Sequence, residues 1–377
     1  MGRRTMPRKS KHIVLIGGGH AHVAVLADWI RHGLPAQRAT LLTPNRNLRY
    51  SGMVPGWIAG QYDRDAGLID VGGLAERAGA QFVLGRCTGL EPDAFRLRTG
   101  GGQALEFDIA SINTGGIGRA RGVLGDDRRL VDIRPIEAFA RQLAALGPQK
   151  RIAVIGGGAG GTELAFALRN WQDADPRPEI VFVTGSDGLL PEMSSAVRRR
   201  ARRKLTAQGI ETIAEDARLE EGRLMAGACD LEPVDLIVAA LGSAAPDWPG
   251  ESSLATDGEG FILVDRFQRS PSHPHIFAAG DVAARSDREV PHSGVHAVFA
   301  GPVLARNLRA AAAGENPHSV YRPRWNNLYL LSTGDGGAIA SYGPFAAQGR
   351  WVARLKHAID SRFISKYARL AGTSVTS

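Results

Sequence analysis

The chain has 377 residues, of which 44% are hydrophobic and 22% are charged. This composition excludes intrinsic disorder and a polytopic membrane protein as descriptions of the whole chain, and the length suits two or three domains of about 150 residues each. Lys and Arg outnumber Asp and Glu by 46 to 38, giving a net charge of +8. That charge favours anionic partners such as nucleotides, acidic lipids or nucleic acid. The two cysteines, Cys87 and Cys229, exclude a disulfide framework and suit a reducing compartment.

A basic segment at the start of the chain leads directly into an apolar strand. Residues 1–11 are followed by the strand-like residues 13–16, without the apolar stretch and small-residue cleavage site of a secretory signal. No window of 18 apolar residues occurs in the sequence. We therefore expect a cytoplasmic protein without a signal peptide or a membrane-spanning helix.

Two segments of the sequence resemble each other. Residues 12–26 and residues 151–165 each contain a short apolar strand, a run of three glycines and an apolar spacing typical of a helix. A further apolar run follows each of them, at residues 39–43 and 179–184, so each copy completes a βαβ unit. The pattern predicts an α/β protein with two Rossmann-like dinucleotide-binding domains.

The first glycine loop suits a pyrophosphate. Its first glycine allows a tight turn, and the next two let backbone NH groups and the helix N-terminus approach phosphate oxygens. His22 occupies the place of the usual third helix glycine, and a threonine stands where an acidic ribose-binding residue is common. A tight turn without a ligand is the alternative. The residues predicted to contact the cofactor here are Gly17, Gly18, Gly19, His20 and Thr43.

The second glycine loop matches the dinucleotide-binding pattern more closely, because glycine fills all three positions and Glu163 follows on the helix. The strand after it ends at Thr184 without a carboxylate, so we expect only modest discrimination between NADH and NADPH. The basic residues 198–204 lie beyond this strand; they form a solvated helix face, or contact a 2′-phosphate or an anionic membrane. The glycines predicted to bind the second nucleotide are Gly156, Gly158 and Gly161.

A third motif, residues 276–281, is an apolar strand that ends in Gly280 and Asp281. Two further apolar runs, residues 107–113 and 235–241, each end in a turn of small residues. With the two glycine loops, these motifs resemble the FAD-dependent pyridine nucleotide-disulfide oxidoreductase family. The resemblance implies that Asp281 binds the ribityl chain of FAD. It also implies that Thr114, Gly115 and Gly242 lie at the crossings between the two domains.

Four later motifs are similar to one branch of that family, the oxidoreductase often fused to selenide, water dikinase. They comprise residues 50–56, 294–298, 301–308 and 331–335. This branch resembles type II NADH dehydrogenases and sulfide:quinone oxidoreductases. The resemblance implies hydride transfer from NAD(P)H to FAD and electron transfer to a small acceptor, with a quinone as one candidate. The alternative is a flavin-binding partner protein linked to selenium metabolism, without turnover of its own.

The resemblance also bears on the redox centre. Residues 50–60, which correspond to the disulfide-bearing helix of the family, contain no cysteine, so we exclude dithiol chemistry. Glu163 matches a glutamate that type II NADH dehydrogenases place near the nicotinamide and the flavin; capping or pairing within its own domain is the alternative. We expect Pro55, Val295 and His296 to line an apolar slot for the acceptor. His20 and His22 cannot share a helix face, so we expect no metal site.

Residues 351–370 form a basic amphipathic helix by their spacing. Its apolar stripe is expected to dock on the protein itself, on a second subunit as in a homodimer, or on the inner face of a membrane. We expect no nucleic-acid partner. The predicted organisation is an FAD domain formed by residues 1–118 and 248–318, an NAD(P) domain of residues 119–247, and a C-terminal cap of residues 319–377.

Overall fold

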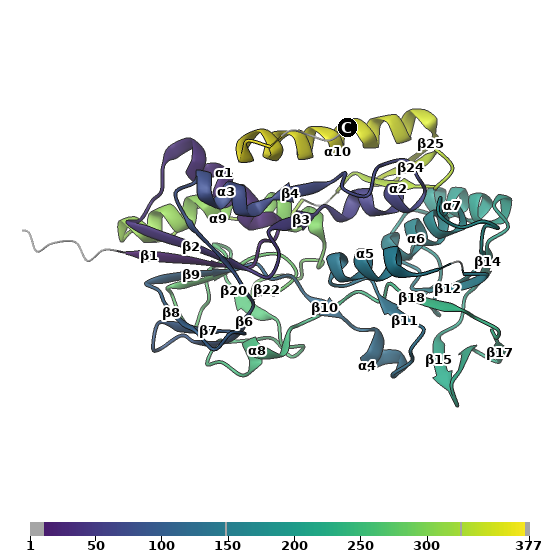
Figure 1. The fold of residues 1–377 in the computed structure, drawn as a ribbon, viewed down its shortest axis with the longest axis horizontal. Helices are drawn as coiled ribbons and strands as arrows, with labels where there is room; N and C mark the ends of the chain where they lie inside the picture. Colours follow the sequence, from purple (N-terminus) through teal and green to yellow (C-terminus); the bar gives the residue numbers. More distant parts are fainter. Residues whose placement is uncertain (1–10, 148, 325, 374–377) are drawn as a thin grey trace, which may run out of the picture.

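The computed structural model describes residues 11–147, 149–324 and 326–373. The chain forms two lobes, each built on a five-stranded parallel sheet, and the C-terminal helix α10 (Arg350–Ala371) runs along one side of both (Figure 1). The small antiparallel pair of β10 (Ile117–Gly118) and β19 (Ser243–Ala244) lies where the chain crosses between the lobes. The predicted α/β class with two dinucleotide-binding domains is confirmed.

The first lobe contains a parallel sheet with β1 at its centre. β1 pairs with β2 on one side, with Val14 opposite Thr40, and with β9 on the other side. The strand order places the first βα turn and the ends of β9 and β21 at one edge of the sheet, where doubly wound folds bind nucleotides. In sheet order the strands are β21 (Ile276–Ala278), β9 (Ile109–Ile112), β1 (His12–Ile16), β2 (Arg38–Thr43) and β5 (Gln81–Leu84).

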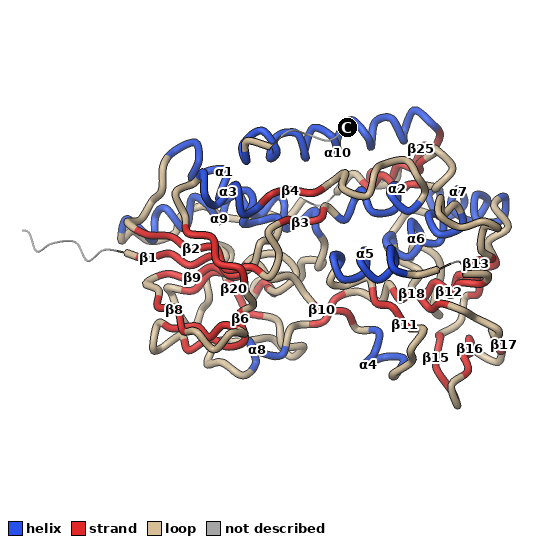
Figure 2. The backbone as a smooth tube through the Cα atoms, in the orientation of Figure 1, coloured by secondary structure: helices blue, strands red, loops and turns tan. Residues whose placement is uncertain are grey.

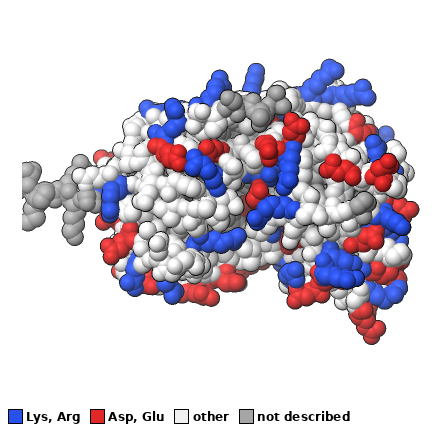
Figure 3. All heavy atoms as spheres, viewed as in Figure 1, with Lys and Arg blue, Asp and Glu red and all other residues white. Residues whose placement is uncertain are grey.

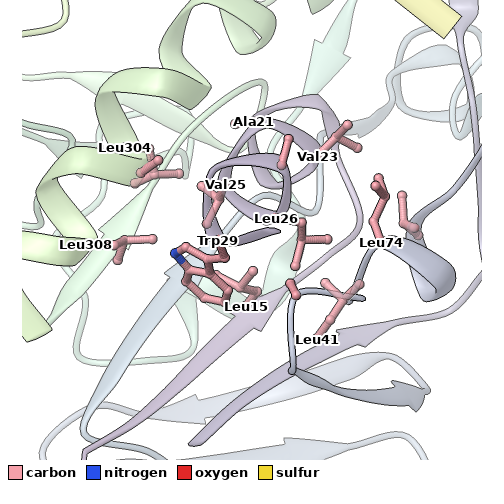
Figure 4. Close-up of a cluster of buried hydrophobic side chains, with 14 of the residues drawn as sticks. Leu15, Ala21, Val23, Val25, Leu26, Trp29, Leu41, Leu74, Leu304 and Leu308 are labelled. Carbon is pink, nitrogen blue, oxygen red and sulfur yellow. The ribbon is translucent and has the colours of Figure 1, made fainter. Parts of the chain in front are cut away.

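Helices cover one face of this sheet, and short strands cover the other (Figure 2). Side chains from α1, α9 and the sheet meet in one apolar cluster, in which Leu15, Trp29 and Leu304 are buried (Figure 4). Burial of such side chains is the dominant stabilising contribution to the lobe. The covering elements are α1 (His20–His32), α3 (Val71–Arg77), α9 (Gly294–Ala313), β6 (Cys87–Glu91), β7 (Arg96–Thr99), β8 (Ala104–Glu106), α8 (Asp247–Gly250), β20 (Ile262–Val264) and β22 (Ala283–Arg285).

The second lobe repeats the arrangement. Its central strand β12 pairs in parallel with β13 and β18, and a small antiparallel sheet lies beside it. The main sheet consists, in order, of β11 (Leu130–Asp132), β18 (Leu236–Ala239), β12 (Arg151–Ile155), β13 (Glu179–Val183) and β14 (Glu211–Ile213). The other elements are α4 (Ala120–Leu124), α5 (Ile136–Ala145), α6 (Ala159–Arg169), α7 (Ser195–Ala207), β15 (Ala217–Glu220), β16 (Arg223–Ala226) and β17 (Cys229–Asp230).

Two further segments connect the lobes. One is a linker after β2 that holds β3 (Asn47–Arg49), a 3-10 turn η1 (Ser51–Met53), α2 (Val54–Ile58) and β4 (Leu68–Asp70). The other is the C-terminal cap of β23 (Tyr329–Ser332), β24 (Ala338–Tyr342), β25 (Phe345–Gly349) and α10. α10 packs against α3 and β4 of the first lobe and against all three cap strands. The cap strand β23 in turn contacts α6 of the second lobe.

The buried face of α10 differs from the predicted apolar stripe. Tyr367 is buried and Phe363 packs against the first core, as expected, but Trp351 is exposed. The buried face instead includes the charged pair Lys356 and Asp360. These two charges form an ion pair, Lys356 donates to the Gly52 carbonyl oxygen and Asp360 accepts from Tyr50, which makes their burial tolerable. The apolar stripe docks on the protein in the second half of the helix and is exposed in the first half, where contact with a second subunit or a membrane stays a prediction.

The two five-stranded sheets and the sheet of the cap each lie within one predicted domain, and the exact domain boundaries stay a prediction. Residues 1–10, where a signal peptide would begin, lie outside the described residues, and its expected absence stays a prediction. Among the residues that are described, no helix is long and apolar enough to cross a membrane.

Candidate functional site

A cavity of about 560 Å³ lies at the junction of the two lobes. The first glycine loop, the end of β2 and the turn after β9 line one part of it, and the start of α6 and the helix α2 line another. The structure therefore brings together residues that the sequence places in six separate segments. The predicted site residues that line this cavity are Gly17, Gly18, Gly19, His20, Thr43, Pro55, Thr114, Gly115, Glu163 and Asp281.

The first glycine loop is pressed against the turn after β9. A Cβ on Gly17, whose φ is +93°, would lie 2.5 Å from the Asn113 carbonyl oxygen, and one on Gly19 would lie 2.4 Å from Asn113 Oδ1. Only glycine fits at these positions. The backbone NH groups of Gly18 and His20 have no hydrogen-bond partner among the described residues. The loop thus presents free NH donors at the N-terminus of α1, as an anionic group requires.

Asn113 is a site residue that sequence reasoning missed. Its Oδ1 accepts hydrogen bonds from the NH groups of Ala21 (3.0 Å) and His22 (3.3 Å), and its Nδ2 donates to the Ala279 carbonyl oxygen at 2.6 Å. One amide thereby joins the first turn of α1, the end of β9 and the end of β21. Its position directly before the predicted contacts Thr114 and Gly115 was the available signal.

His22 takes the place of the third helix glycine by filling the interior. Its Nδ1 lies 2.6 Å from the Gly17 carbonyl oxygen and its Nε2 2.9 Å from the Ser111 hydroxyl. Burial lowers the pKa of His22 to about 4. His22 therefore packs between the glycine loop and β9 of the sheet.

His20 lines the cavity instead. Its Nε2 is buried without a hydrogen-bond partner in the described part of the chain, and its ring packs near the rings of Tyr50 and Phe363. Burial lowers the pKa of His20 to about 4, so the ring is neutral at pH 7. Across residues 11–147, 149–324 and 326–373, no three His, Cys, Asp or Glu side chains are grouped to hold a metal ion.

Asp281 follows β21 and is buried at the wall of the cavity. The guanidinium of Arg134 donates a 2.6 Å hydrogen bond to Asp281 Oδ2. Arg134 comes from the loop between β11 and α5 of the second lobe and also lines the cavity. The carboxylate expected to meet a sugar hydroxyl therefore already has a cationic partner from the opposite lobe, which the sequence did not indicate.

Glu163 lies on α6 at the other part of the cavity. Its Oε1 accepts a 2.8 Å hydrogen bond from the NH of Ser332, on the first strand of the cap. Glu163 therefore pairs with the cap rather than within its own domain. Burial raises the pKa of Glu163, although the nearby ammonium of Lys356 opposes this effect.

Lys356 connects Glu163 to a second buried acid. Its Nζ donates a 2.8 Å hydrogen bond to the Gly52 carbonyl oxygen and lies 3.1 Å from Asp360 Oδ2. The Tyr50 hydroxyl donates to the other oxygen of Asp360 at 3.2 Å. Burial raises the pKa of Asp360, and the two acids raise the pKa of Lys356 against the effect of its own burial. One ammonium thus faces two buried carboxyl groups, which favours a bound proton on one of them.

The second glycine loop has the geometry of a second nucleotide site. Gly156 has φ +118°, and a Cβ on it would lie 2.4 Å from the Ala240 carbonyl oxygen. Gly161 lets α6 pack against the loop, since its Cβ would collide with the Gly156 oxygen. A Cβ on Gly158 would meet nothing within 4 Å, so this position faces open space, as a phosphate contact requires. Gly242, at φ +89°, forms the turn after β18.

Comparison with known proteins agrees with this geometry. Residues 11–301 match the family model described as pyridine nucleotide-disulphide oxidoreductase. The chain belongs to this family. It is therefore a flavoprotein oxidoreductase that uses FAD and a nicotinamide nucleotide.

Individual relatives cover almost the whole chain at low identity. Oxidoreductase ptaL of Pestalotiopsis fici is 24% identical over 371 residues, which cover 92% of this chain and 95% of the relative. The structure of NDH2 from Plasmodium falciparum in complex with NADH has a TM-score of 0.79 at 12% identity and covers 97% of both chains. The sulfide:quinone oxidoreductase from Aquifex aeolicus has a TM-score of 0.75 at 19% identity and covers 96% of this chain and 92% of that chain.

The cavity fits the FAD that membership of the family implies. It combines a glycine cradle that a Cβ would fill, free NH donors at the start of α1, and the buried, unpartnered Nε2 of His20. It continues from Thr43, at the end of β2, to Glu163 and Pro55. The first glycine loop and Thr43 would hold the adenosine and pyrophosphate of FAD, and residues at the Pro55 and Glu163 end would then hold its flavin ring.

The positions of the two cysteines do not suit the disulfide chemistry for which the family is named. Cys87 lines the cavity near Thr43, away from the ring end, and Cys229 is exposed on the small sheet of the second lobe. The Cys87 thiol donates to the Gly89 carbonyl oxygen, and burial raises its pKa to about 11. A thiol with so high a pKa is protonated at pH 7 and is a poor nucleophile.

Two predicted acceptor-site residues are not at the cavity. Gly294 and Ala297 of α9 line it, whereas Val295 and His296, on other faces of that helix, do not. His296 is turned to a second, small cavity behind Asp281, which Gly280 also lines, and its Nδ1 lies 3.0 Å from the Tyr321 hydroxyl. Positions 294 and 297 face the cavity together because they lie one helical turn apart. The acceptor role of Val295 and His296 stays a prediction.

Proposed function

We propose that this oxidoreductase transfers a hydride from a nicotinamide nucleotide to FAD and passes the electrons to a quinone-class acceptor at a membrane surface, on the cytoplasmic side. One observation carries the proposal. A single cavity joins the FAD loop to the start of α6, directly after the second glycine loop, and has no thiol at its ring end. Such a cavity allows a nicotinamide ring to meet the flavin without a disulfide between the nucleotide and the acceptor.

Residues of the second lobe would hold the nicotinamide nucleotide. The open backbone at Gly158 and the N-terminus of α6 suit its phosphates. Ile133, Ile136 and Leu164 line the cavity between this loop and the first lobe and would exclude water from the reacting rings. FAD, when bound, supplies the hydride acceptor and the electron donor.

Reduction of a quinone to a quinol takes up two electrons and two protons. The hydride from NAD(P)H supplies both electrons and one of the protons. Glu163 is suited to hold the other, because burial raises the pKa of its carboxyl group and it lines the cavity. The nearby ammonium of Lys356 stabilises the carboxylate that remains after the proton has left. Pro55, Val54 and Trp57 on α2 form an apolar surface beside this position, and the first two line the cavity.

A quinone acceptor is supported by an exposed apolar surface on the cap, here named the cap patch. Such side chains on a surface mark a contact with lipid or with another protein. The cap patch comprises Tyr342, Phe345, Trp351, Leu355 and Ile359.

Basic side chains accompany the cap patch. Arg350, Arg354 and Arg362 are exposed on α10, and no ion pair to them occurs among the described residues. Figure 3 shows Lys and Arg side chains along the edge of the molecule where α10 lies. An apolar patch with cations around it favours an anionic bilayer over a second subunit.

Anaerobic reduction tests the proposed function. The flavin of the purified holoprotein is expected to bleach within seconds of mixing with NADH or NADPH. Reoxidation by a short-chain ubiquinone or menaquinone is expected to exceed reoxidation by ferredoxin or by oxygen. A flavin that stays oxidised with both nucleotides would favour the flavin-binding partner protein instead. Fast reduction followed by reoxidation only with ferredoxin would retain the enzyme and overturn the quinone.

A further inference from the structure

The turn between β23 and β24, residues 333–337, is here named the cap turn and lies along one face of α6. Directly before it, the Ser332 NH donates to Glu163 Oε1 at 2.8 Å. A Cβ on Gly334, whose φ is +72°, would lie 2.4 Å from the Phe166 carbonyl oxygen, so the turn passes directly over the helix. Positions 163 and 166 are neighbours on the helix surface. The cap therefore contacts the second lobe at the part of α6 that carries the buried acid.

Gln208, the residue at which α7 ends, holds the cap turn to the end of α6. Its Nε2 donates a 2.8 Å hydrogen bond to the Thr333 carbonyl oxygen. Its Oε1 accepts from Asn170 Nδ2 at 2.9 Å, and Asn170 is the residue at which α6 ends. The amide of Gln208 is therefore fixed at both its oxygen and its nitrogen. The end of β23 is attached to α6 at two points, directly at Glu163 and through Gln208 at Asn170, about two helical turns apart.

Two other side chains contact the cap turn. Gln61 Nε2 donates to a carbonyl oxygen within it at 3.1 Å. Lys204 of α7 forms an ion pair with Asp335, and both of these side chains are partly exposed. Exposed ion pairs add little to stability, because water competes for both charges. Of the three contacts, the one from Gln208 lies nearest in the chain to Ser332.

The Ser332 NH is the one hydrogen-bond donor to the Glu163 carboxyl group in the described part of the chain. The ionisable groups that face Glu163 are Lys356 and Asp360 on α10 and Tyr50 in the linker. The other elements packed against α6, which are α2, β12 and β13, present apolar side chains to it. An NH that donates to a carboxylate favours its charged form. Loss of the Ser332 contact would therefore make Glu163 keep its proton to a higher pH.

We propose that Gln208 is a positioning residue for Glu163: it fixes the cap turn along α6 and so keeps the Ser332 NH on the Glu163 carboxyl group. The inference rests on the proposed function, because that function assigns a proton to Glu163. Gln208 does not line the cavity, so it acts on the reaction only through the cap turn. Its effect is to set the pH above which Glu163 no longer carries the proton that the acceptor needs.

Infrared difference spectra of the oxidised holoprotein, recorded as a function of pH, test the inference without turnover. A protonated carboxyl group has a band of its own, and the Glu163 band is the one that Glu163→Gln lacks. Gln208→Met keeps the approximate size of the side chain but removes the donor to Thr333. The midpoint pH of the Glu163 band is then expected to rise by about one unit.

Two further variants accompany Gln208→Met. Asn170→Ala releases the Gln208 amide without touching the cap turn and is expected to raise the midpoint in the same direction by a smaller amount. Lys204→Met, which removes the exposed ion pair to the same turn, is the matched control. It is expected to shift the midpoint by less than about 0.3 units.

The outcomes separate this inference from the proposed function. An unchanged midpoint in Gln208→Met, even with a lower Tm, would show a merely structural role and overturn the inference, as would the lack of any band that depends on Glu163. An equal rise in Lys204→Met would also overturn it. If Gln208→Met does not fold, the midpoint of Asn170→Ala decides. A raised midpoint in a protein whose reduced flavin no quinone reoxidises would support the inference and contradict the proposed function.

Discussion

Arg134 and Asp281 form an ion pair of 2.6 Å across the cavity, between the loop after β11 of the second lobe and the turn after β21 of the first. The pair places a cation beside the carboxylate that we predict to contact the FAD ribityl chain. Asp281 is buried, so a lost partner is not readily replaced by water. The pair also connects the two lobes at the wall of the cavity.

The first prediction concerns flavin retention. Asp281→Ala removes a charge-assisted hydrogen bond of about 1.5–3 kcal/mol, so FAD is expected to bind about 10 to 100 times more weakly and to be lost in dialysis. Arg134→Gln leaves the carboxylate in place and is expected to keep its flavin. The absorbance ratio of flavin to protein after dialysis measures both. A full complement of FAD in Asp281→Ala would contradict the assignment of this residue.

The second prediction concerns the pH dependence of stability. The pKa of Glu163 is raised by burial, so above about pH 4.5 the folded protein binds more protons at this group than the unfolded chain. The stabilising contribution of the protonated carboxyl is present at low pH and is lost as the pH rises through the folded pKa. Glu163→Gln stays neutral, so its Tm relative to the wild type is expected to increase between about pH 5 and pH 8.

Glu315→Gln is the control for this measurement, because Glu315 is exposed. Its Tm difference from the wild type is expected to stay constant over the same pH range. A Tm difference for Glu163→Gln that is also constant, or that falls with pH, would show that the Glu163 carboxyl does not carry a raised pKa.

The third prediction concerns the buried charges under α10. Lys356→Met leaves Glu163 and Asp360 without their cation and removes the hydrogen bond to Gly52, which is expected to cost about 3–5 kcal/mol of unfolding free energy. Lys366→Met, at an exposed position of the same helix, is expected to change it by about 0.5 kcal/mol or less. Urea unfolding followed by circular dichroism measures both. Equal midpoints for the two variants would refute a structural role for the buried ammonium.

The fourth prediction concerns the cap patch. The wild type is expected to co-sediment with vesicles that contain about 30% anionic lipid, and less so at high salt, because each cation near such a surface contributes about 1 kcal/mol. The triple variant Phe345→Ser, Trp351→Ser, Leu355→Ser is expected to remain in the supernatant. Leu84→Ser combined with Val123→Ser removes exposed apolar side chains elsewhere and should sediment as the wild type does.

Analytical ultracentrifugation without lipid completes the fourth test. A monomer is expected for the wild type and for the triple variant. The alternative outcome is that the wild type is a dimer, that the triple variant is a monomer, and that neither binds vesicles. This outcome would assign the cap patch to a second subunit and leave a soluble acceptor as the better candidate.

Local sequence patterns account for much of the fold and for part of the site. The two glycine loops, their flanking strands and the helix over residues 350–371 are visible because each is encoded by neighbours in the sequence: apolar periodicity, and glycine where φ is positive or a Cβ would collide. The family follows from the same motifs. Gly17, Gly19 and Glu163 are therefore identifiable from the amino-acid sequence alone.

Residues whose roles depend on partners far away in the chain cannot be identified from local sequence patterns. Asn113 bonds to Ala21 over 92 positions, and Arg134 meets Asp281 over 147 positions. Nothing in the flanking residues of Arg134 or Lys356 distinguishes a cation that is paired with a distant acid from a solvated one. Helical periodicity places Lys356 and Asp360 on the polar face of α10, and only the packed structure shows that they neutralise each other under it.

The sequence by itself thus determined the class of fold, the family, the cofactors and the loops that bind them, since these depend on backbone conformations that short segments specify. The tertiary structure decided which side chains complete the site. Asp216 illustrates the division: the parallel pairing of β13 with β14 brings its carboxylate to Ser186, in the turn after β13, over 30 positions of the chain. Such a contact depends on which strands become neighbours, and the pairing of strands is settled by burial of the whole core rather than by any local pattern.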